Sequence, residues 1–439
     1  MKINQTAESM PQPLSLLPVH FTGRLRRQQA STLSHEASGV RPVRRGCRTW
    51  LIILAGVVIL AVVIAQALQN RRKAEARPPT CAEKLAMTTP ETVAIPATLE
   101  QYQIVFTSAR AGGRDVLLLM NADGSHQRQI SSDSFDAYSP SGSPDGRRLA
   151  FVRTPPAIAQ TYESDIYVMD VDSGNLTRLT DFASGTPLGP VWSPDGEHIA
   201  FTVLFGSFDR GYQELFLMNA DGSNPHQIAD PLMSSAFGPV WSPDGQSLIF
   251  SFQYSRAGYS HRGLYRLDID SNQLTLLTPP TLDSYAPVWS PDGQRLAIAV
   301  HSANPDAPAH PISEIYLMDA NGDNITQLTS HSAFSASPAW SPDGQKIAYF
   351  VQPERGLGHV KIAIMTTDGK LIMRLPVAGR SGPELAWSPD GQYILFSAAQ
   401  DQDIHANAIW LWPIHNQAAH QLTHDCHSNW GPVWVLKQR

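Results

Sequence analysis

The side chains best suited to bind a metal ion gather near the C-terminus, at His420, His424, Asp425, Cys426 and His427. Imidazole, thiolate and carboxylate groups are the ligands that zinc prefers, but this spacing matches no zinc-binding pattern. We therefore expect a loop whose polar side chains face solvent, and no metal site.

A second polar group, Asp319, Asn321 and Asp323, has the alternation that begins a calcium-binding loop. Ser330 stands where such a loop needs a bidentate glutamate, so a hairpin turn is the better interpretation. Hydrolysis is not indicated either, because the sequence has no Gly-x-Ser-x-Gly motif and no segment of hydrolase size follows residue 435. These patterns predict no catalytic residue, no cofactor and no metal.

A sequence repeat defines the elements around these residues. Five copies of Trp-Ser-Pro-Asp-Gly, spaced 47 to 51 residues apart, begin at Trp192, Trp241, Trp289, Trp340 and Trp387. A period near 50 residues indicates stacked supersecondary units. Each copy contains one apolar run ending in Trp, a second after the Asp-Gly pair, a third about 20 residues later and a short fourth run. Four strands in each repeat are the content of one propeller blade.

The Pro-Asp-Gly part of the motif has a structural interpretation. Proline cannot donate to a strand ladder, aspartate bonds nearby backbone amides, and glycine adopts the left-handed conformation that closes a tight turn. We therefore interpret the repeated aspartates as turn residues and not as catalytic carboxylates.

Degenerate copies extend the repeat at both ends. The segment 140–146 is the same element with Gly142 in the Trp position, and 431–434 is a Trp-ending run at the C-terminus. Each of the four strand types then occurs seven times, but the first run, 103–107, has no Trp-ending strand before it. The sequence predicts an all-β fold, a seven-bladed β-propeller of four-stranded blades over residues 101–439, closed by the C-terminal strand around Trp434.

The motifs carry a family resemblance. Trp-Ser-Pro-Asp-Gly followed by Ile-Ala-Phe, then Ile-Tyr-Leu-Met, Asp-Gly-Ser and Gln-Leu-Thr, resembles the repeat of TolB-like β-propellers, which also occurs in the propeller domains of prolyl-oligopeptidase-like proteins. The resemblance covers residues 101–435. It departs from TolB, whose six-bladed propeller follows a small α/β domain. It implies a propeller fold and protein binding, but propellers host many functions.

Residues 50–68 form an uncharged 19-residue stretch, long enough to span a bilayer. Arginines crowd its N-terminal side, which predicts a cytoplasmic N-terminus and an extracytoplasmic propeller. A cleaved signal peptide ending at Ala67 is the alternative, which the long basic lead disfavours. We expect a basic, disordered cytoplasmic tail (1–49), a transmembrane helix acting as signal anchor (50–68) and a linker (69–100), in a single-pass protein of the cell membrane.

Charge divides the chain at the same place. Residues 1–49 hold eight basic and two acidic side chains, whereas residues 78–439 hold 21 basic and 36 acidic ones. An acidic propeller is a poor nucleic-acid binder. The expected partners are therefore the membrane, through the anchor, and a protein, a peptide or an envelope glycan.

Three cysteines bear on the compartment. Cys47 precedes the apolar stretch, Cys81 precedes the first strand and Cys426 precedes the last one. Outside the cytoplasm, Cys81 and Cys426 would share an oxidising environment beside the predicted ring closure. A disulfide between them and two unrelated thiols are both open interpretations.

Strand order predicts a binding face. In a four-stranded meander the Asp-Gly turns share one face, and the connections after the second strand share the other. Those connections, 203–213, 252–263 and 300–313, are predicted to be long and irregular, as functional loops are. The residues predicted to bind are Phe205, Phe208, Arg210, Tyr212, Tyr254, Arg256, Tyr259 and Arg262, together with Tyr138, Phe237, Tyr285 and Trp430 four residues before each Trp position.

Solvated surface is the alternative for the loop residues, and packing between blades is the alternative for the last four. The preferred function is a non-enzymatic binding module anchored in the cell envelope. The alternative is a propeller hydrolase or lyase with its site at the channel mouth.

Overall fold

A computed structural model describes the chain from residue 94 onward. The described ranges are 94–110, 114–132, 134–155, 164–182, 185–206, 211–228, 235–256, 259–279, 281–302, 312–330, 334–352, 360–376, 385–399, 406–416 and 418–437. All of them belong to the second of two units, Pro79–Arg439. The predicted tail, the predicted membrane span and most of the predicted linker lie outside these ranges.

Strands dominate the described residues. Their helical content is one 3₁₀ turn, η1 (Ala97–Leu99), and none of their helices is long and apolar enough to cross a membrane. The strands are β1 (Tyr102–Arg110), β2 (Arg114–Asn121), β3 (Arg128–Gln129), β4 (Asp136–Gly142), β5 (Arg148–Thr154), β6 (Asp165–Asp170), β7 (Leu176–Arg178), β8 (Thr186–Trp192), β9 (His198–Phe205), β10 (Tyr212–Asn219), β11 (His226–Gln227), β12 (Ser235–Trp241), β13 (Ser247–Arg256), β14 (Tyr259–Asp268), β15 (Leu274–Leu276), β16 (Asp283–Trp289), β17 (Arg295–Ser302), β18 (Ile312–Asp319), β19 (Thr326–Gln327), β20 (Phe334–Trp340), β21 (Lys346–Gln352), β22 (Lys361–Thr366), β23 (Leu371–Pro376), β24 (Leu385–Trp387), β25 (Tyr393–Ala399), β26 (Asn407–Pro413), β27 (His420–Gln421) and β28 (Asn429–Leu436).

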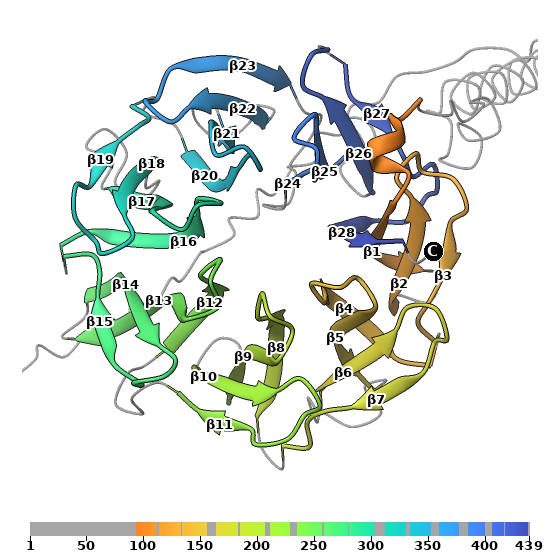
Figure 1. The fold of residues 1–439 in the computed structure, drawn as a ribbon, viewed down its shortest axis with the longest axis horizontal. Helices are drawn as coiled ribbons and strands as arrows, with labels where there is room; N and C mark the ends of the chain where they lie inside the picture. Colours follow the sequence, from red (N-terminus) through yellow and green to blue (C-terminus); the bar gives the residue numbers. More distant parts are fainter. Residues whose placement is uncertain are drawn as a thin grey trace, which may run out of the picture. The chain divides into compact units, whose positions relative to one another are not determined.

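Antiparallel sheets follow one another around a common centre (Figure 1). The described strands form five four-stranded sheets and one eight-stranded sheet, in which β18 meets β20 through the single parallel pair Ser313 and Phe334. The strand that ends at the repeated Trp position lies nearest the centre (Figure 1). The predicted all-β fold of four-stranded antiparallel units is confirmed, and its form is propeller-like.

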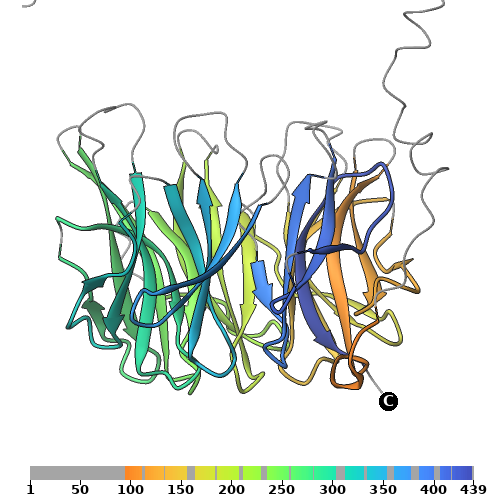
Figure 2. The same cartoon turned by 90° about the horizontal axis from the view of Figure 1, so that it is seen from above.

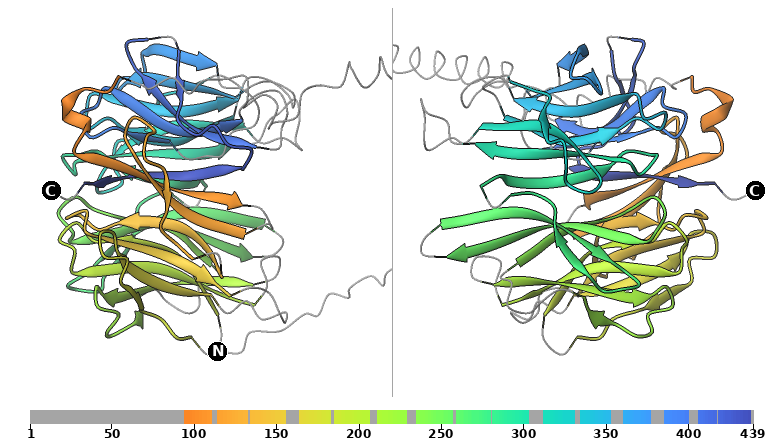
Figure 3. Two further views of the ribbon diagram at one scale, coloured as in Figure 1. Left: turned by 90° about the vertical axis from the view of Figure 1, so that its right-hand side faces the viewer. Right: turned by 60° about the vertical axis from the view of Figure 1, so that its left-hand side comes forward.

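The C-terminal strand β28 completes the sheet of β1, β2 and β3. Trp434 faces Ile104 and Val435 faces Gln103 across this antiparallel pair. Figure 3 shows β28, in dark blue, lying against β1, in orange. The predicted pairing of the last strand with the first is confirmed.

The Asp-Gly turns have the predicted geometry. The Asp195 carboxylate accepts hydrogen bonds from the Ser193 hydroxyl and from the backbone N–H of Glu197, at 2.9 Å for the latter. Gly196 has a φ of 75°, a conformation that glycine adopts without steric cost. Equivalent bonds form at Asp244 and Asp292. These carboxylates stabilise turns.

The core lies between neighbouring sheets. Trp192, which ends β8, packs with Ala150 and Ile166 of the preceding sheet and with Phe201 of its own. Its Nε1 donates a hydrogen bond to the backbone carbonyl of Ser141, 3.1 Å away in β4. The repeated Trp therefore contributes both buried apolar area and a specific bond to the sheet before it.

Candidate functional site

Each sheet has two ends, and different connections between strands lie at each end. The Asp-Gly turns connect first to second strands and third to fourth strands, so they lie at one end. The far ends of the second and third strands lie at the other end, the upper edge in Figure 2. We call the two ends the turn face and the loop face.

One predicted loop is wrong. Residues 252–263, expected to be irregular, belong almost entirely to the paired strands β13 and β14, whose ladder continues to the pair Arg256 and Tyr259. The phenylalanine and tyrosine residues here favour extended backbone, and pairing satisfies its polar groups. The other two connections are shorter than predicted, since β9 extends to Phe205 and β17 to Ser302.

Towards the loop face, Phe237, Arg262 and Tyr285 line a common pocket of about 280 Å³ between the sheets that begin with β12 and β16. Ser251 and Gln253 complete its polar lining. The three residues predicted from separate segments of the chain are therefore brought together. Two aromatic walls with one guanidinium and one amide can hold an apolar group that carries a polar end.

A backbone bulge brings each aromatic residue into this position. The pairing register shifts directly after Phe237 in β12 and after Tyr285 in β16. The next residues have positive φ, 56° at Gly238 and 49° at Ala286. Bulges bend a strand and redirect its side chains, and they often lie beside functional sites.

Tyr285 is the centre of a polar cluster at this pocket. The guanidinium carbon of Arg262 lies 5.7 Å from the centroid of the Tyr285 ring, and the His301 ring stacks on Tyr285 with centroids 4.3 Å apart. The Tyr285 hydroxyl forms a hydrogen bond of 2.7 Å with the Ser313 hydroxyl. Burial raises the pKa of Tyr285 and outweighs the opposing effects of Ser313 and Arg262, so the phenol is protonated near neutral pH.

His301 and Asp283 face each other across β16 and β17. Burial lowers the pKa of His301, and Arg262 acts in the same direction, whereas the Asp283 carboxylate opposes it. The buried Nδ1 of His301 and Oδ1 of Asp283 have no hydrogen-bond partner among the described residues. Sequence reasoning missed Asp283, His301 and Ser313 as functional candidates.

The other two predicted aromatic residues line a different pocket. Tyr138 and Trp430 border a cavity of about 210 Å³ with Thr107 and Asp115. Burial raises the pKa of Asp115, and the neighbouring Asp136 carboxylate adds to the effect. This pocket is equivalent in the repeat to the one at Tyr285, but it presents a carboxyl group where the other presents Arg262.

The structure describes the side chains of only some of the remaining predicted residues. Phe205 and Tyr212 stack at the loop face with ring centroids 5.4 Å apart, and 46% of Tyr212 is exposed. The backbone of Tyr254, Arg256 and Tyr259 lies in β13 and β14. Their side chains, and the whole of Phe208 and Arg210, lie outside the described part of the structure.

Two of the residues considered as metal ligands have other partners. Asp425 forms a 2.9 Å ion pair with Arg110, and Cys426 is disulfide-bonded. Both other cysteines, Cys47 and Cys81, lie outside the described residues. At the calcium-like segment, Asp319 and Asp323 accept side-chain bonds within one hairpin turn, as predicted. Within the described ranges, no three His, Cys, Asp or Glu residues form a group able to hold a metal.

Comparison with known proteins decides the family. The model of the TolB beta propeller domain matches residues 97–298 and 214–435. The chain belongs to this TolB β-propeller family. It is 32% identical over 83 residues to the Tol-Pal system protein TolB of Alcanivorax borkumensis, a match that covers 19% of this chain and 18% of that protein. The chain spans 36% or less of the length of the curated relatives it matches.

Solved structures of low identity share the fold of this TolB-family chain. A puromycin hydrolase has a TM-score of 0.56 at 17% identity, with 79% of this chain and 55% of the hydrolase covered. An oligogalacturonate lyase of Vibrio parahaemolyticus has a TM-score of 0.52 at 13% identity, with 72% and 84% covered. Identities this low compare folds only.

Proposed function

We propose that this chain is a membrane-anchored, extracytoplasmic TolB-family propeller of seven blades that binds a protein or peptide partner at its loop face without transforming it. Residues 50–68 would be the single-pass anchor, with the N-terminus in the cytoplasm. The arginines that precede residue 50 favour this orientation under the positive-inside rule.

The strand pairing supports seven blades. The eight-stranded sheet contains two sets of four strands, β16 to β19 and β20 to β23, which meet at one residue pair only. The five four-stranded sheets supply the other blades, including the one in which β28 pairs with β1. The sequence repeat gives the same number.

The observation that carries the binding proposal is the stacking of Arg262 on Tyr285 in a pocket walled by Phe237. Arginine and aromatic residues dominate the energetics of protein interfaces when they surround a pocket. The guanidinium is the charged group of this pocket lining, so the inserted group carries a carboxylate, from an acidic side chain or a chain terminus. Exposed aromatic side chains elsewhere on the loop face, Tyr212 and Phe334, extend the surface.

Co-purification of partners with the membrane-extracted full chain tests this proposal. The double variant Arg262→Ala, Phe237→Ala should reduce the amount of recovered partner at least tenfold, because both side chains line the pocket. Gln345→Ala changes an exposed residue of the turn face and is the matched control, expected to leave recovery unchanged. Equal recovery with both variants would contradict the proposal.

The alternative, a hydrolase or lyase, has one observation in its favour, the neutral His301 beside Asp283 and Tyr285. Such a group could accept a proton at this pocket. The two functions differ in the fate of the ligand. A binding protein returns it unchanged by mass spectrometry after incubation, whereas an enzyme returns a cleaved product that a His301→Gln variant does not form.

A further inference from the structure

A second pocket lies at the turn face and follows from the repeat. The residue six positions after a Trp position begins the second strand, and at three interfaces it approaches the Trp of the next sheet. Arg148 places its guanidinium carbon 4.5 Å from the ring centroid of Trp192, and Arg295 lies 5.2 Å from that of Trp340. A cation over an indole face is an attractive arrangement.

The residue at this position is not always an arginine. His198 approaches Trp241 with ring centroids 6.4 Å apart. The next residue in the series is Ser247, opposite Trp289, and its hydroxymethyl group is too short to cover an indole. Between the sheets that begin with β12 and β16, the repeat therefore lacks the side chain that approaches the Trp at the interfaces immediately before and after this one.

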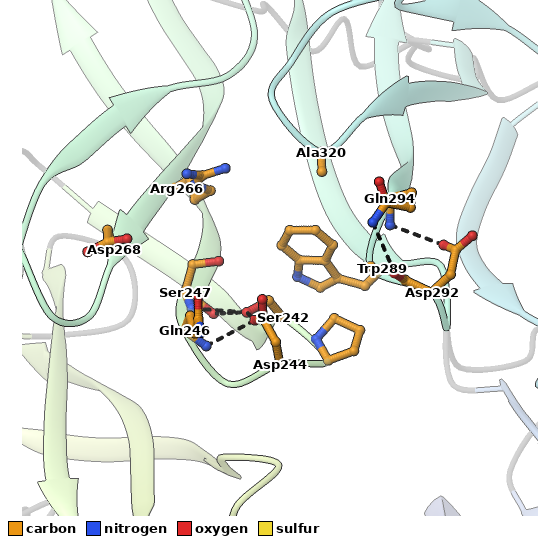
Figure 4. A pocket seen from close by; sticks show the side chains of 12 residues that line it. Ser242, Asp244, Gln246, Ser247, Arg266, Asp268, Trp289, Asp292, Gln294 and Ala320 are labelled. Carbon is orange, nitrogen blue, oxygen red and sulfur yellow. Dashed lines mark hydrogen bonds between the residues drawn. The ribbon is translucent and has the colours of Figure 1, made fainter.

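The missing side chain leaves a cavity of about 380 Å³, larger than either pocket at the loop face. Figure 4 shows Trp289 directed into it, with Ser247 and Arg266 on the opposite wall. Gln246 and Gln294 stand at its rim. The volume is ample for the side chain of an arginine.

Three carboxylates surround the cavity, at Asp244, Asp268 and Asp292, against one cation, Arg266. Each of the three uses one oxygen for its own turn, and the other accepts no hydrogen bond from the described residues. Bonds from the Ser242 hydroxyl and a backbone N–H lower the pKa of Asp244, and the Arg266 charge contributes, so this carboxyl is ionised at neutral pH. The lining is therefore net negative.

Arg266 does not itself cover Trp289. It occupies a position in β14 that corresponds to Leu217 in β10 and Leu317 in β18, as the pairing registers show. Its charge lies near Asp244 and Asp268, whose pKa values it helps to lower. Stacking of its guanidinium on an indole is absent from the described contacts, in contrast to Arg148 and Arg295.

We propose that this cavity binds an arginine side chain of a partner polypeptide, whose guanidinium lies on Trp289 as that of Arg148 lies on Trp192. The internal repeat supplies the template for the bound state. The site lies on the turn face, so it is separate from the loop-face pocket and does not depend on the function proposed for that pocket.

Titration of the full chain with N-acetyl-arginine amide, followed by ligand-observed NMR, tests the site. Binding should be weak and saturable, and N-acetyl-citrulline amide, which has the same shape without the charge, should bind roughly 2- to 30-fold more weakly. Equal affinity for the two probes would overturn the proposal.

Ser247→Arg should abolish binding of the arginine probe, because it places a guanidinium of the chain itself over Trp289. The matched control is His198→Arg, which introduces an arginine at the equivalent position of the neighbouring interface and should leave binding unchanged. Retained binding in folded Ser247→Arg would also overturn the proposal. If that variant fails to fold, Trp289→Leu replaces it. Loss of binding of the arginine probe is then expected, and retained binding would contradict the proposal. Arg262→Ala should not alter this binding.

Discussion

Trp434 faces Ile104 across the pair formed by the last and first strands, and its ring meets the ring of Tyr102 edge to face at 6.4 Å. More than 300 residues separate the two strands in sequence, so this contact closes the sheet of β1. Deletion of residues 428–439 should expose the edge of β1 and remove the buried Val435, at a cost of several kcal/mol.

Urea denaturation of the full chain with and without residues 428–439 measures that cost. Deletion of 438–439 alone is the control and should leave the midpoint in place, because β28 ends at Leu436. An unchanged midpoint after the longer deletion would refute the closure by β28.

The disulfide at Cys426 has a predicted partner in Cys81. Its formation would close a loop of more than 300 residues, worth about 2–5 kcal/mol. Non-reducing peptide mapping should recover the two cysteines in one cross-linked peptide, and denatured full chain should titrate a single thiol, that of Cys47. Three titratable thiols would contradict the pairing.

Stability should fall in acid because of the turn aspartates. Bonds from the Ser193 hydroxyl and the Glu197 N–H lower the pKa of Asp195 below its usual 3.8. A carboxyl group with a lowered pKa stabilises the fold above pH 3.8, and that contribution is lost as the pH falls through the folded-state pKa. Asp195→Asn, which is uncharged throughout, should show a smaller loss of thermal midpoint between pH 5 and pH 3 than the parent. Parallel curves would argue against this assignment.

Membrane topology gives a separate prediction. Protease added to intact cells or spheroplasts should digest residues beyond the proposed anchor and should spare a tag at residue 1, because the arginines before Trp50 favour a cytoplasmic N-terminus. Disrupting the membrane should then expose the tag. Immediate loss of the tag in intact cells would contradict the proposed orientation.

The repeat made the fold predictable. In each repeat the first strand ends at the Trp of Trp-Ser-Pro-Asp-Gly. The apolar runs left without a partner at the two ends of the repeat region implied the pairing of β28 with β1. The loop from 252 to 263 was predicted wrongly, because sequence alone does not show that Tyr254 pairs with His261 and extends the hairpin.

The candidate site was predictable only in part. Phe237, Arg262 and Tyr285 were expected on the loop face, but Asp283, His301 and Ser313 meet Tyr285 through the strand register, which depends on the bulge after Tyr285. The sequence did contain a signal for this bulge. Three copies of the repeat have a glycine at the bulge position, in Gly189-Pro-Val-Trp, Gly238-Pro-Val-Trp and Gly431-Pro-Val-Trp, and all three glycines have positive φ. The turn-face cavity was likewise visible as Ser247 in a position held by Arg148 and Arg295.

The central claim is that a partner protein binds the loop face, and site-specific photo-crosslinking in the native host tests it most directly. A photoreactive phenylalanine analogue replaces Tyr212 on the loop face or Gln345 on the turn face, both exposed. We predict that position 212 captures a partner, that Arg262→Ala abolishes the cross-link, and that position 345 does not capture that partner. Capture from position 345 alone, or from position 212 with no effect of Arg262→Ala, would contradict the account.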